Sequence, residues 1–139
     1  MIAKVPQLNR RRILFIDDEE SMVMLATWFL ERLGYEVSGY MESDPALAAL
    51  QANPSAFDLV VTDQNMLGPS GLDVAREAMR LRPDLPVAII SGYVTRDLRD
   101  RAAALGVREV IEKPNRAEDM AQAIARLLSR LAVVPPAIG

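Results

Sequence analysis

The chain has 139 residues, which suits one domain of ordinary size with a buried core. Half of its residues are hydrophobic, a quarter are charged and the formal net charge is −3, so the composition is that of a soluble globular protein and gives no electrostatic reason to expect nucleic-acid binding. It contains no cysteine and no histidine, which excludes disulfides, thiol nucleophiles, Ser-His-Asp triads, histidine-ligated zinc and phosphohistidine carriers. Any chemistry must therefore come from carboxylates, hydroxyls, lysine or a hard cation.

We expect a cytoplasmic protein that does not contact a membrane. No stretch of the sequence reaches the length of a membrane span. Residues 1–12 also lack the apolar stretch of a signal peptide.

Five short runs of apolar residues are predicted to be strands. Four of them are almost wholly apolar or β-branched, as buried parallel strands are, whereas the second is more polar, which is typical of a sheet edge. The runs cover residues 13–16, 36–40, 59–62, 87–90 and 107–111.

An amphipathic stretch follows each run and is predicted to be a helix. The first covers residues 20–33, and its apolar residues share one predicted core face: Met22, Leu25, Ala26, Phe29 and Leu33. The next three are predicted to begin at Asp44, at Ser70 and near Thr95, and to end before Pro54, before Pro83 and at Gly106. The fifth begins at Asn115 and turns five apolar residues to one face: Met120, Ile124, Leu127, Leu128 and Leu131.

Strands that alternate with helices, with a strand first, indicate a parallel α/β sheet. Five such units are typical of the flavodoxin-like (βα)5 fold, a three-layer sandwich whose five-stranded parallel sheet has the order 2-1-3-4-5. We expect this domain to cover residues 11–132, between an N-terminal arm over residues 1–10 and an apolar, proline-bearing tail or linker over residues 133–139. A site is expected beyond the carboxyl ends of the strands, where the first and third strands are neighbours.

Polar residues follow the predicted strands at that edge. Asp17 and Asp18 follow the first strand, Asp63 the third, Ser91 the fourth and Lys113 the fifth. Each residue has an ordinary explanation by itself, as a helix N-terminal acid, a turn residue or a solvated lysine. Together, three carboxylates at one edge repel one another and need a cation. Mg²⁺ meets that need, because it prefers carboxylate, water and phosphate oxygens.

With Mg²⁺ bound, Asp63 would stay ionised and could attack phosphorus as a nucleophile. The transition state of phosphoryl transfer spreads negative charge over three oxygens. The metal ion, the Lys113 ammonium group and the Ser91 hydroxyl are three suitable partners for those oxygens. The pattern therefore predicts a Mg²⁺-dependent phosphoacceptor site.

Residues 11–131 resemble the receiver domain of two-component response regulators. The resemblance depends on four motifs in order: Ile16-Asp17-Asp18-Glu19; Val61-Thr62-Asp63-Gln64-Asn65-Met66 with Gly71 eight residues past Asp63; Ile90-Ser91-Gly92; and Glu112-Lys113-Pro114. It implies that Asp63 is the phosphoacceptor and a metal ligand, that Asp18 binds Mg²⁺ directly, that Asp17 holds metal-bound water and that Asn65 supplies its backbone carbonyl. Ser91 is then the switch hydroxyl that moves onto the phosphoryl group, and Lys113 is the ion-pair partner of that group.

The function that the resemblance implies is a phosphorylation-dependent signalling switch in a two-component phosphorelay. The phosphoryl donor would be a phosphohistidine on a histidine kinase or a histidine phosphotransfer domain. The protein would catalyse its own phosphorylation and dephosphorylation without being a separate enzyme, as a monomer or weak dimer. The resemblance also implies a cis peptide bond between Lys113 and Pro114. We expect no output domain in this chain, and a stand-alone regulator and a receiver cut from a hybrid histidine kinase both fit.

Two positions depart from the usual receiver pattern. Val110 stands where receivers carry an aromatic residue, three positions before the lysine, and Leu67 replaces the proline that usually follows Met66. The first departure leaves open how phosphorylation reaches other surfaces. A phosphohydrolase with an aspartate nucleophile is the main alternative, but Asn65 stands where such enzymes need a second acid. A phosphorylation-independent interaction module would have lost an acidic or lysine position, and none is lost.

The first predicted helix also carries a candidate partner surface. Met24 and Trp28 lie one turn apart on the side opposite the predicted core face, where a solvated helix should be polar. Exposed apolar patches mark contact sites, and Trp and Met are favoured in interface cores. The alternative is that the apolar tail, or a second copy of the chain in a crystal dimer, covers these residues. Tyr93, two residues past Ser91, is either a gate for water or an ordinary surface tyrosine.

Overall fold

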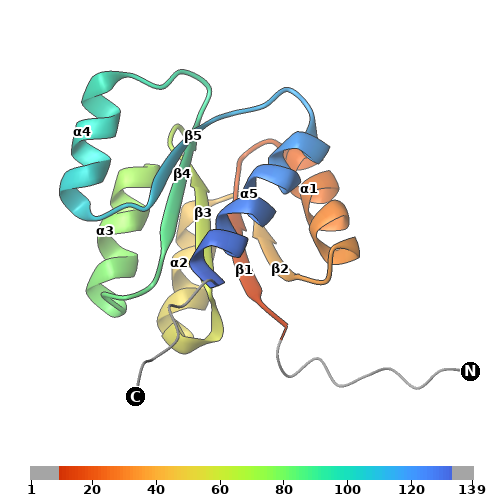
Figure 1. Ribbon diagram of the computed structural model, residues 1–139. Coiled ribbons are helices and arrows are strands. Elements are labelled where there is room, and N and C mark those ends of the chain that lie inside the picture. The colour runs from red at the N-terminus through yellow and green to blue at the C-terminus, as the bar shows by residue number, and fades with distance from the viewer. Residues whose placement is uncertain (1–9, 133–139) are drawn as a thin grey trace, which may run out of the picture.

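The computed structural model describes residues 10–132, so most of the predicted arm and the whole predicted tail lie outside the described residues. The elements are β1 Arg12–Ile16, α1 Glu20–Arg32, β2 Glu36–Tyr40, α2 Ser43–Ala52, the 3-10 helix η1 Pro54–Ala56, β3 Leu59–Asp63, α3 Gly71–Leu81, β4 Val87–Ser91, α4 Arg96–Leu105, β5 Glu109–Glu112 and α5 Ala117–Ala132. All neighbouring strands pair in parallel, in the order β2-β1-β3-β4-β5 (Figure 1). The predicted flavodoxin-like fold and strand order are confirmed.

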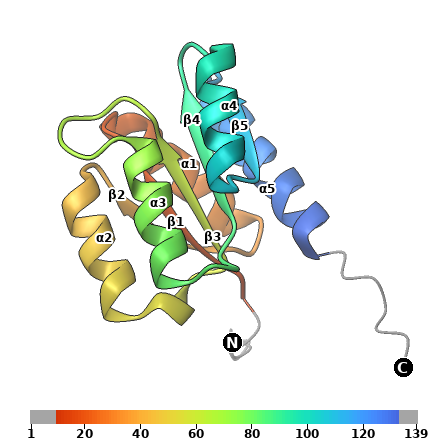
Figure 2. The ribbon, with the colours of Figure 1, turned by 90° about the vertical axis from the view of Figure 1, so that its left-hand side faces the viewer.

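The sheet is the middle layer of three. Helices α1 and α5 cover one face and helices α2, α3 and α4 cover the other (Figures 1 and 2). Strand β1 shows how the sequence supplies both cores, because Ile13 and Phe15 pack toward α1 and α5 whereas Leu14 and Ile16 pack toward the other three helices. The central strands are buried on both faces, which explains their unbroken apolar runs. Strand β2 is a half-exposed edge strand, as predicted.

The helix boundaries agree with the predicted punctuation to within two residues. The Thr95 side chain accepts a hydrogen bond from the Leu98 backbone N–H at 3.0 Å and begins α4, and Gly106 ends it with φ of 93°. Helix α2 begins one residue before the predicted Asp44, and α5 begins at Ala117 rather than at Asn115. In α5, four of the five predicted core residues are buried and Leu131 is half-buried.

The predicted core face of α1 is partly wrong. The buried residues of the helix are Met22, Ala26 and Leu30, which follow one another at intervals of four. Leu25 is 49% exposed and Leu33, the residue that caps the helix C-terminus, is 56% exposed. Helix α1 meets the sheet through a narrow stripe, so apolar residues one position to either side of the stripe lie at its margin or outside it. Phe29 is half-buried at that margin and packs against the core.

Candidate functional site

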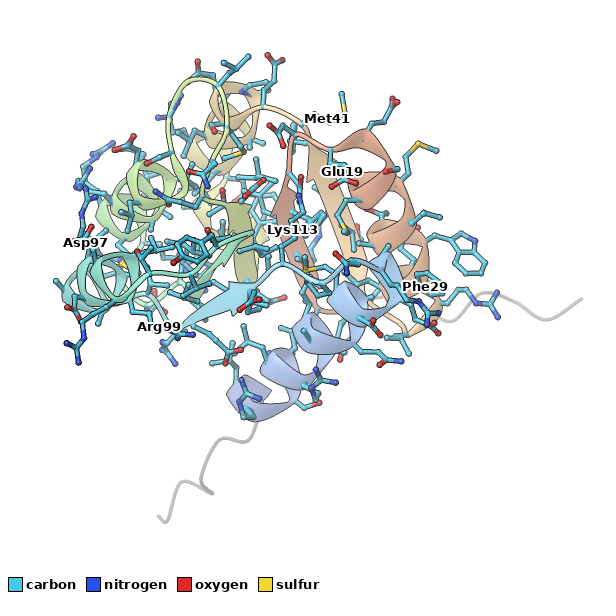
Figure 3. The ribbon with its side chains drawn as sticks, turned by 90° about the horizontal axis from the view of Figure 1, so that it is seen from above. Glu19, Phe29, Met41, Asp97, Arg99 and Lys113 are labelled. Atoms are coloured by element: carbon cyan, nitrogen blue, oxygen red, sulfur yellow. The ribbon has the colours of Figure 1, made fainter. Side chains whose placement is uncertain are left out.

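The carboxyl ends of the strands lie together at the top of the sheet in Figure 1, and Figure 3 looks down onto this edge. Asp17 and Asp18 follow β1, and Asp63 is the last residue of β3. One carboxylate oxygen from each of the three residues lies within 4.8 Å of the others. Asp17 is fully buried and Asp63 is 5% exposed, whereas Asp18 is open to solvent. The structure therefore brings the predicted carboxylates together as one acidic cluster.

Lys113 follows β5 and reaches into the acidic cluster. Its Nζ atom lies 3.0 Å and 2.9 Å from the two carboxylate oxygens of Asp17, and 3.7 Å from Oδ2 of Asp63. It also lies 3.2 Å from Oε1 of Glu19, which Figure 3 labels on the same edge. Glu19 had not been predicted as a partner of the lysine, although it directly follows the acidic pair. One ammonium group is thus shared among three carboxylates.

Asp17 holds this arrangement in place. Its Oδ1 atom accepts hydrogen bonds from the Glu19 backbone N–H at 2.9 Å and from Lys113. Its Oδ2 atom is buried and meets Nζ only as an ion pair, without the geometry of a hydrogen bond. Both carboxylate oxygens are therefore paired with one ammonium group, and Oδ2 has room for a hydrogen bond from cation-bound water.

The electrostatics of the cluster reflect its burial. Burial raises the pKa of Asp63, and the neighbouring charge of Asp17 raises it further. Burial likewise raises the pKa of Asp17. Burial favours a lower pKa for Lys113, but its contacts with Asp17, Asp63 and Glu19 together outweigh that effect and raise the pKa above the ordinary value. Lys113 is therefore positively charged at neutral pH. Its single charge cannot balance all the carboxylates of the acidic cluster, and a divalent cation could offset the remainder.

Ser91 is the last residue of β4 and is almost fully buried. Its hydroxyl donates a hydrogen bond to the Tyr93 carbonyl at 2.9 Å and accepts a longer one from the Tyr93 backbone N–H. Tyr93 itself is 80% exposed and lines a polar hollow of about 220 Å³ with Asn65, Ser91 and Arg101. The tyrosine thus lies beside the site, and its predicted role as a gate stays a prediction.

The expected cis peptide bond before Pro114 is wrong, because no peptide bond among residues 10–132 is cis. The trans form is the ordinary state of a bond that precedes proline. The Lys113 backbone N–H donates to the Ser91 carbonyl at 2.8 Å, which continues the pairing of β5 with β4 by one residue. This pairing aims Lys113 at the acidic cluster without a cis bond.

The remaining predicted positions lie at or near the surface. Asn65 is exposed, and its backbone N–H donates to Oδ1 of Asp63 at 3.4 Å. Met24 and Trp28 are 64% and 52% exposed, so their predicted exposure on α1 is confirmed. The Trp28 ring packs edge-on against Phe29, and the Arg32 guanidinium lies 4.7 Å from its centre. Val110 is half-buried against the core beneath α4.

Comparison with known proteins identifies the family. Residues 13–125 match the response regulator receiver domain. The chain belongs to this family. It is 30% identical over 118 residues to the response regulator receiver protein CpdR of Brucella abortus, a match that covers 85% of this chain and 97% of CpdR. Some relatives are longer, and the chain spans only 21% of the two-component response regulator ARR14 of Arabidopsis thaliana.

Solved structures agree with this receiver domain. A receiver domain protein from Clostridium thermocellum is 32% identical, with a TM-score of 0.76, over 87% of this chain and 96% of that one. A response regulator from Burkholderia pseudomallei, solved with a phosphorylated aspartic acid, a calcium ion and citrate, is 25% identical, with a TM-score of 0.72, over 91% of this chain and 75% of that one. The chain is therefore a receiver domain of two-component signalling, with an acidic cluster that could hold a metal ion. No helix among residues 10–132 is long and apolar enough to cross a membrane.

Proposed function

We propose that this receiver domain accepts a phosphoryl group onto Asp63 from a phosphohistidine, in a Mg²⁺-dependent reaction. The observation that carries the proposal is the surroundings of Asp63 at the end of the central strand β3. Its carboxylate is nearly buried, lies within 4.8 Å of two other carboxylates and has the Lys113 ammonium 3.7 Å away. A nucleophile, an acidic cluster and a cation that can pair with phosphate oxygens therefore occupy one edge of the sheet.

The residues of the cluster fit Mg²⁺. Asp18, Asp63 and the Asn65 backbone carbonyl would hold the ion, and Asp17 would hold water bound to it. All of these groups offer oxygen atoms, which Mg²⁺ prefers as ligands. The buried Asp17 Oδ2 atom has no hydrogen bond and could accept one from water bound to the ion. When bound, Mg²⁺ would offset the charge of the carboxylates and of the phosphoryl oxygens. The phosphorylated aspartic acid and calcium ion in the Burkholderia pseudomallei structure support both parts of this proposal.

In the transfer itself, a carboxylate oxygen of Asp63 attacks phosphorus while the bond from phosphorus to the donor imidazole breaks, and the imidazole leaves with the electron pair. The product is an acyl phosphate on Asp63. Lys113 then exchanges part of its contact with Asp17 and Glu19 for a phosphoryl oxygen. The Ser91 hydroxyl gives up its hydrogen bond to the Tyr93 carbonyl and donates to another phosphoryl oxygen, which releases the loop before α4. Water later hydrolyses the acyl phosphate. In this proposal the protein acts only on itself, in its own phosphorylation and dephosphorylation.

The proposed donor is a histidine kinase or a histidine phosphotransfer domain that docks on α1. Met24 and Trp28 offer it exposed apolar surface, and the helix begins at Glu20, close to the acidic cluster. Trp28 also lines a groove of about 370 Å³ between α1 and α5. We place this exchange in the cytoplasm, between proteins and without direct contact with nucleic acid, and with the receiver as a monomer or weak dimer.

Labelling with a small phosphodonor tests the acceptor. Acetyl phosphate and Mg²⁺ should add one phosphoryl group, seen by intact-protein mass spectrometry, and EDTA should abolish the addition. Asp63→Asn should lose it. Asp58→Asn is the matched control, because Asp58 lies at the opposite end of the sheet from the acidic cluster. There it accepts a hydrogen bond from the backbone N–H of Arg12, the first residue of β1, at 2.8 Å. Unchanged labelling of Asp63→Asn would show that the acceptor is another residue.

A further inference from the structure

Gln64, the residue after the proposed acceptor, joins both ends of the loop that leads into α3. Its backbone N–H donates to the Ile90 carbonyl at 2.7 Å, and its own carbonyl accepts from the Gly71 N–H at 3.1 Å. Its side-chain Oε1 atom accepts from the Leu72 N–H at 2.9 Å. The chain therefore leaves β3 at Gln64, runs through residues 65–70 and returns to the same residue.

Two further features hold this loop. An added Cβ atom at Gly71 would lie 2.8 Å from the Asp63 carbonyl oxygen and 2.9 Å from the Gln64 Cα atom, so only glycine allows the return to come so close. On the outer side, the buried Ser43 hydroxyl donates to the Pro69 carbonyl at 2.8 Å. The base of the loop is thus fixed at two places, whereas Leu67 in its middle is 94% exposed.

The Gln64 side chain accepts a hydrogen bond from a backbone N–H group of α3 that the Ser70–Asp73 cap does not reach. The first backbone N–H groups of a helix have no partner within the helix. At the start of α3, Ser70 and Asp73 form a reciprocal capping box that satisfies the Asp73 and Ser70 N–H groups. The Leu72 N–H depends on Gln64 instead. The first turn of α3 is thereby tied directly to the residue that follows the acceptor.

We propose that Gln64 is a positioning residue for the phosphoacceptor site. By tying α3 to the end of β3, its side-chain amide holds the loop in which Asn65 contacts Asp63 at 3.4 Å. This inference depends on the proposed function, because that function makes the Asn65 backbone carbonyl a ligand of Mg²⁺. It concerns affinity for the metal ion, since the Gln64 side chain contacts the loop rather than the reacting atoms.

The test measures Mg²⁺ binding to the full chain by calorimetry without a phosphodonor, and then acetyl phosphate labelling as a function of Mg²⁺ concentration. Gln64→Met keeps the length of the side chain but removes the acceptor oxygen. It should raise the dissociation constant and the half-saturating Mg²⁺ concentration about three- to tenfold, the range expected for losing a helix cap. Labelling at saturating Mg²⁺ should stay within about twofold of the wild type, because the reacting groups are untouched.

Two other variants make the result specific. Gln64→Glu keeps an acceptor oxygen and adds negative charge at a helix N-terminus, so it should bind Mg²⁺ at least as tightly as the wild type. Gln51→Met removes an exposed side-chain amide on α2 that donates a long hydrogen bond to Glu77 at 3.4 Å but does not contact the loop after Asp63, so it should leave Mg²⁺ affinity unchanged. If Gln64→Met does not fold, Gln64→Asn replaces it, because the shorter side chain withdraws the oxygen from the Leu72 N–H, and it should weaken Mg²⁺ binding about twofold or more.

Unchanged Mg²⁺ affinity in Gln64→Met, or in Gln64→Asn where it replaces that variant, would overturn the inference. Equal weakening in Gln64→Met and Gln64→Glu would overturn it as well, because the acceptor oxygen would then not matter. Failure of the proposed function would look different. A wild-type protein that takes no phosphoryl group contradicts that function, whereas the calorimetric comparison still decides the role of Gln64.

Discussion

Lys113 is the residue on which the charge balance of the site depends. It is 18% exposed at the side chain and is the ion-pair partner of the buried Asp17. Its attraction to Asp17, Glu19 and Asp63 raises its pKa, so it remains protonated throughout the physiological range. Under the proposed function, a phosphoryl group on Asp63 would have to draw the ammonium group away from Asp17 and Glu19. In that proposal, Mg²⁺ would share the negative charge that the ammonium group leaves behind.

Replacing Lys113 tests this balance. Lys113→Met leaves the buried carboxylates without their cation, which should lower the free energy of unfolding by about 2 kcal/mol or more at pH 7. Saturating Mg²⁺ should restore more stability to this variant than it adds to the wild type, because the variant carries more uncompensated charge. Urea unfolding with and without Mg²⁺ measures both effects. Arg116→Met, which removes an exposed cation beside Glu118, is the control. Equal stabilisation by Mg²⁺ in the wild type and Lys113→Met would contradict the argument.

Gly71 gives a second prediction at this scale. Its Cβ atom would have to push the β3 backbone at Asp63 and Gln64 aside, so Gly71→Ala should lower the free energy of unfolding by about 1–3 kcal/mol. Gly92→Ala is the matched control, because nothing lies within 4 Å of a Cβ atom there. Urea unfolding of the two variants decides the point. The close approach is unimportant if they are equally stable.

At the scale of single elements, the starts of the helices connect the scaffold to the site. Helix α3 begins with the Ser70–Asp73 capping box, directly after the loop that follows Asp63. Helix α4 begins with Thr95, at the end of the loop that Ser91 holds through Tyr93. The first turn of α3 is therefore bonded to Gln64, the residue that follows Asp63, whereas the Thr95 cap of α4 is joined to Ser91 only through the backbone of the loop between them.

The capping box predicts a specific pH dependence of stability. The hydrogen bond from the Ser70 backbone N–H lowers the pKa of Asp73, so the ionised carboxylate stabilises the folded state. Asp73→Ala should cost about 0.5–1 kcal/mol at pH 7. A group whose pKa is lowered by folding contributes fully above its unfolded pKa, so the difference should be constant above about pH 4 and shrink as the pH falls further. Urea unfolding between pH 7 and pH 3 measures it. A difference that grows on acidification would contradict the assignment.

Helix α1 carries the prediction about the phosphodonor. Trp28→Glu places a charge in the exposed patch and should slow phosphotransfer from the cognate kinase or phosphotransfer domain at least about tenfold, as expected for an aromatic interface anchor. Labelling by acetyl phosphate should not change, because Trp28 is not part of the acidic cluster. Ala104→Glu, on an exposed part of α4 across the sheet, is the control. If both rates fall together in Trp28→Glu, or neither changes, the patch has a structural role.

At the scale of the whole molecule, the sequence predicts the fold and the site for one shared reason. Buried parallel strands need continuous apolar runs, and their carboxyl ends meet at one edge, so Asp17, Asp63, Ser91 and Lys113 could be brought together from their positions in the sequence alone. The helix boundaries followed from local signals such as Thr95 and Gly106, because capping depends on neighbouring residues.

Other features depend on three-dimensional packing that periodicity does not contain. Leu25 and Leu30 are equally apolar, and only the position of α1 on the sheet decides that Leu30 is buried and Leu25 is not. The ion pair between Glu19 and Lys113 depends on how closely the ends of β1 and β5 approach each other. The Gln64 cap joins a strand end to a helix start, and no local motif indicates it.

The central claim is that Asp63 carries the phosphoryl group, and chemical mapping tests it most directly. After reaction with acetyl phosphate and Mg²⁺, borohydride reduces an acyl phosphate to the alcohol, so a phosphorylated aspartate is recovered as homoserine. Peptide sequencing by mass spectrometry should find homoserine at position 63 and aspartate at positions 17 and 18, and no homoserine when Mg²⁺ is omitted. Homoserine at any other aspartate, with position 63 unmodified, would contradict the account.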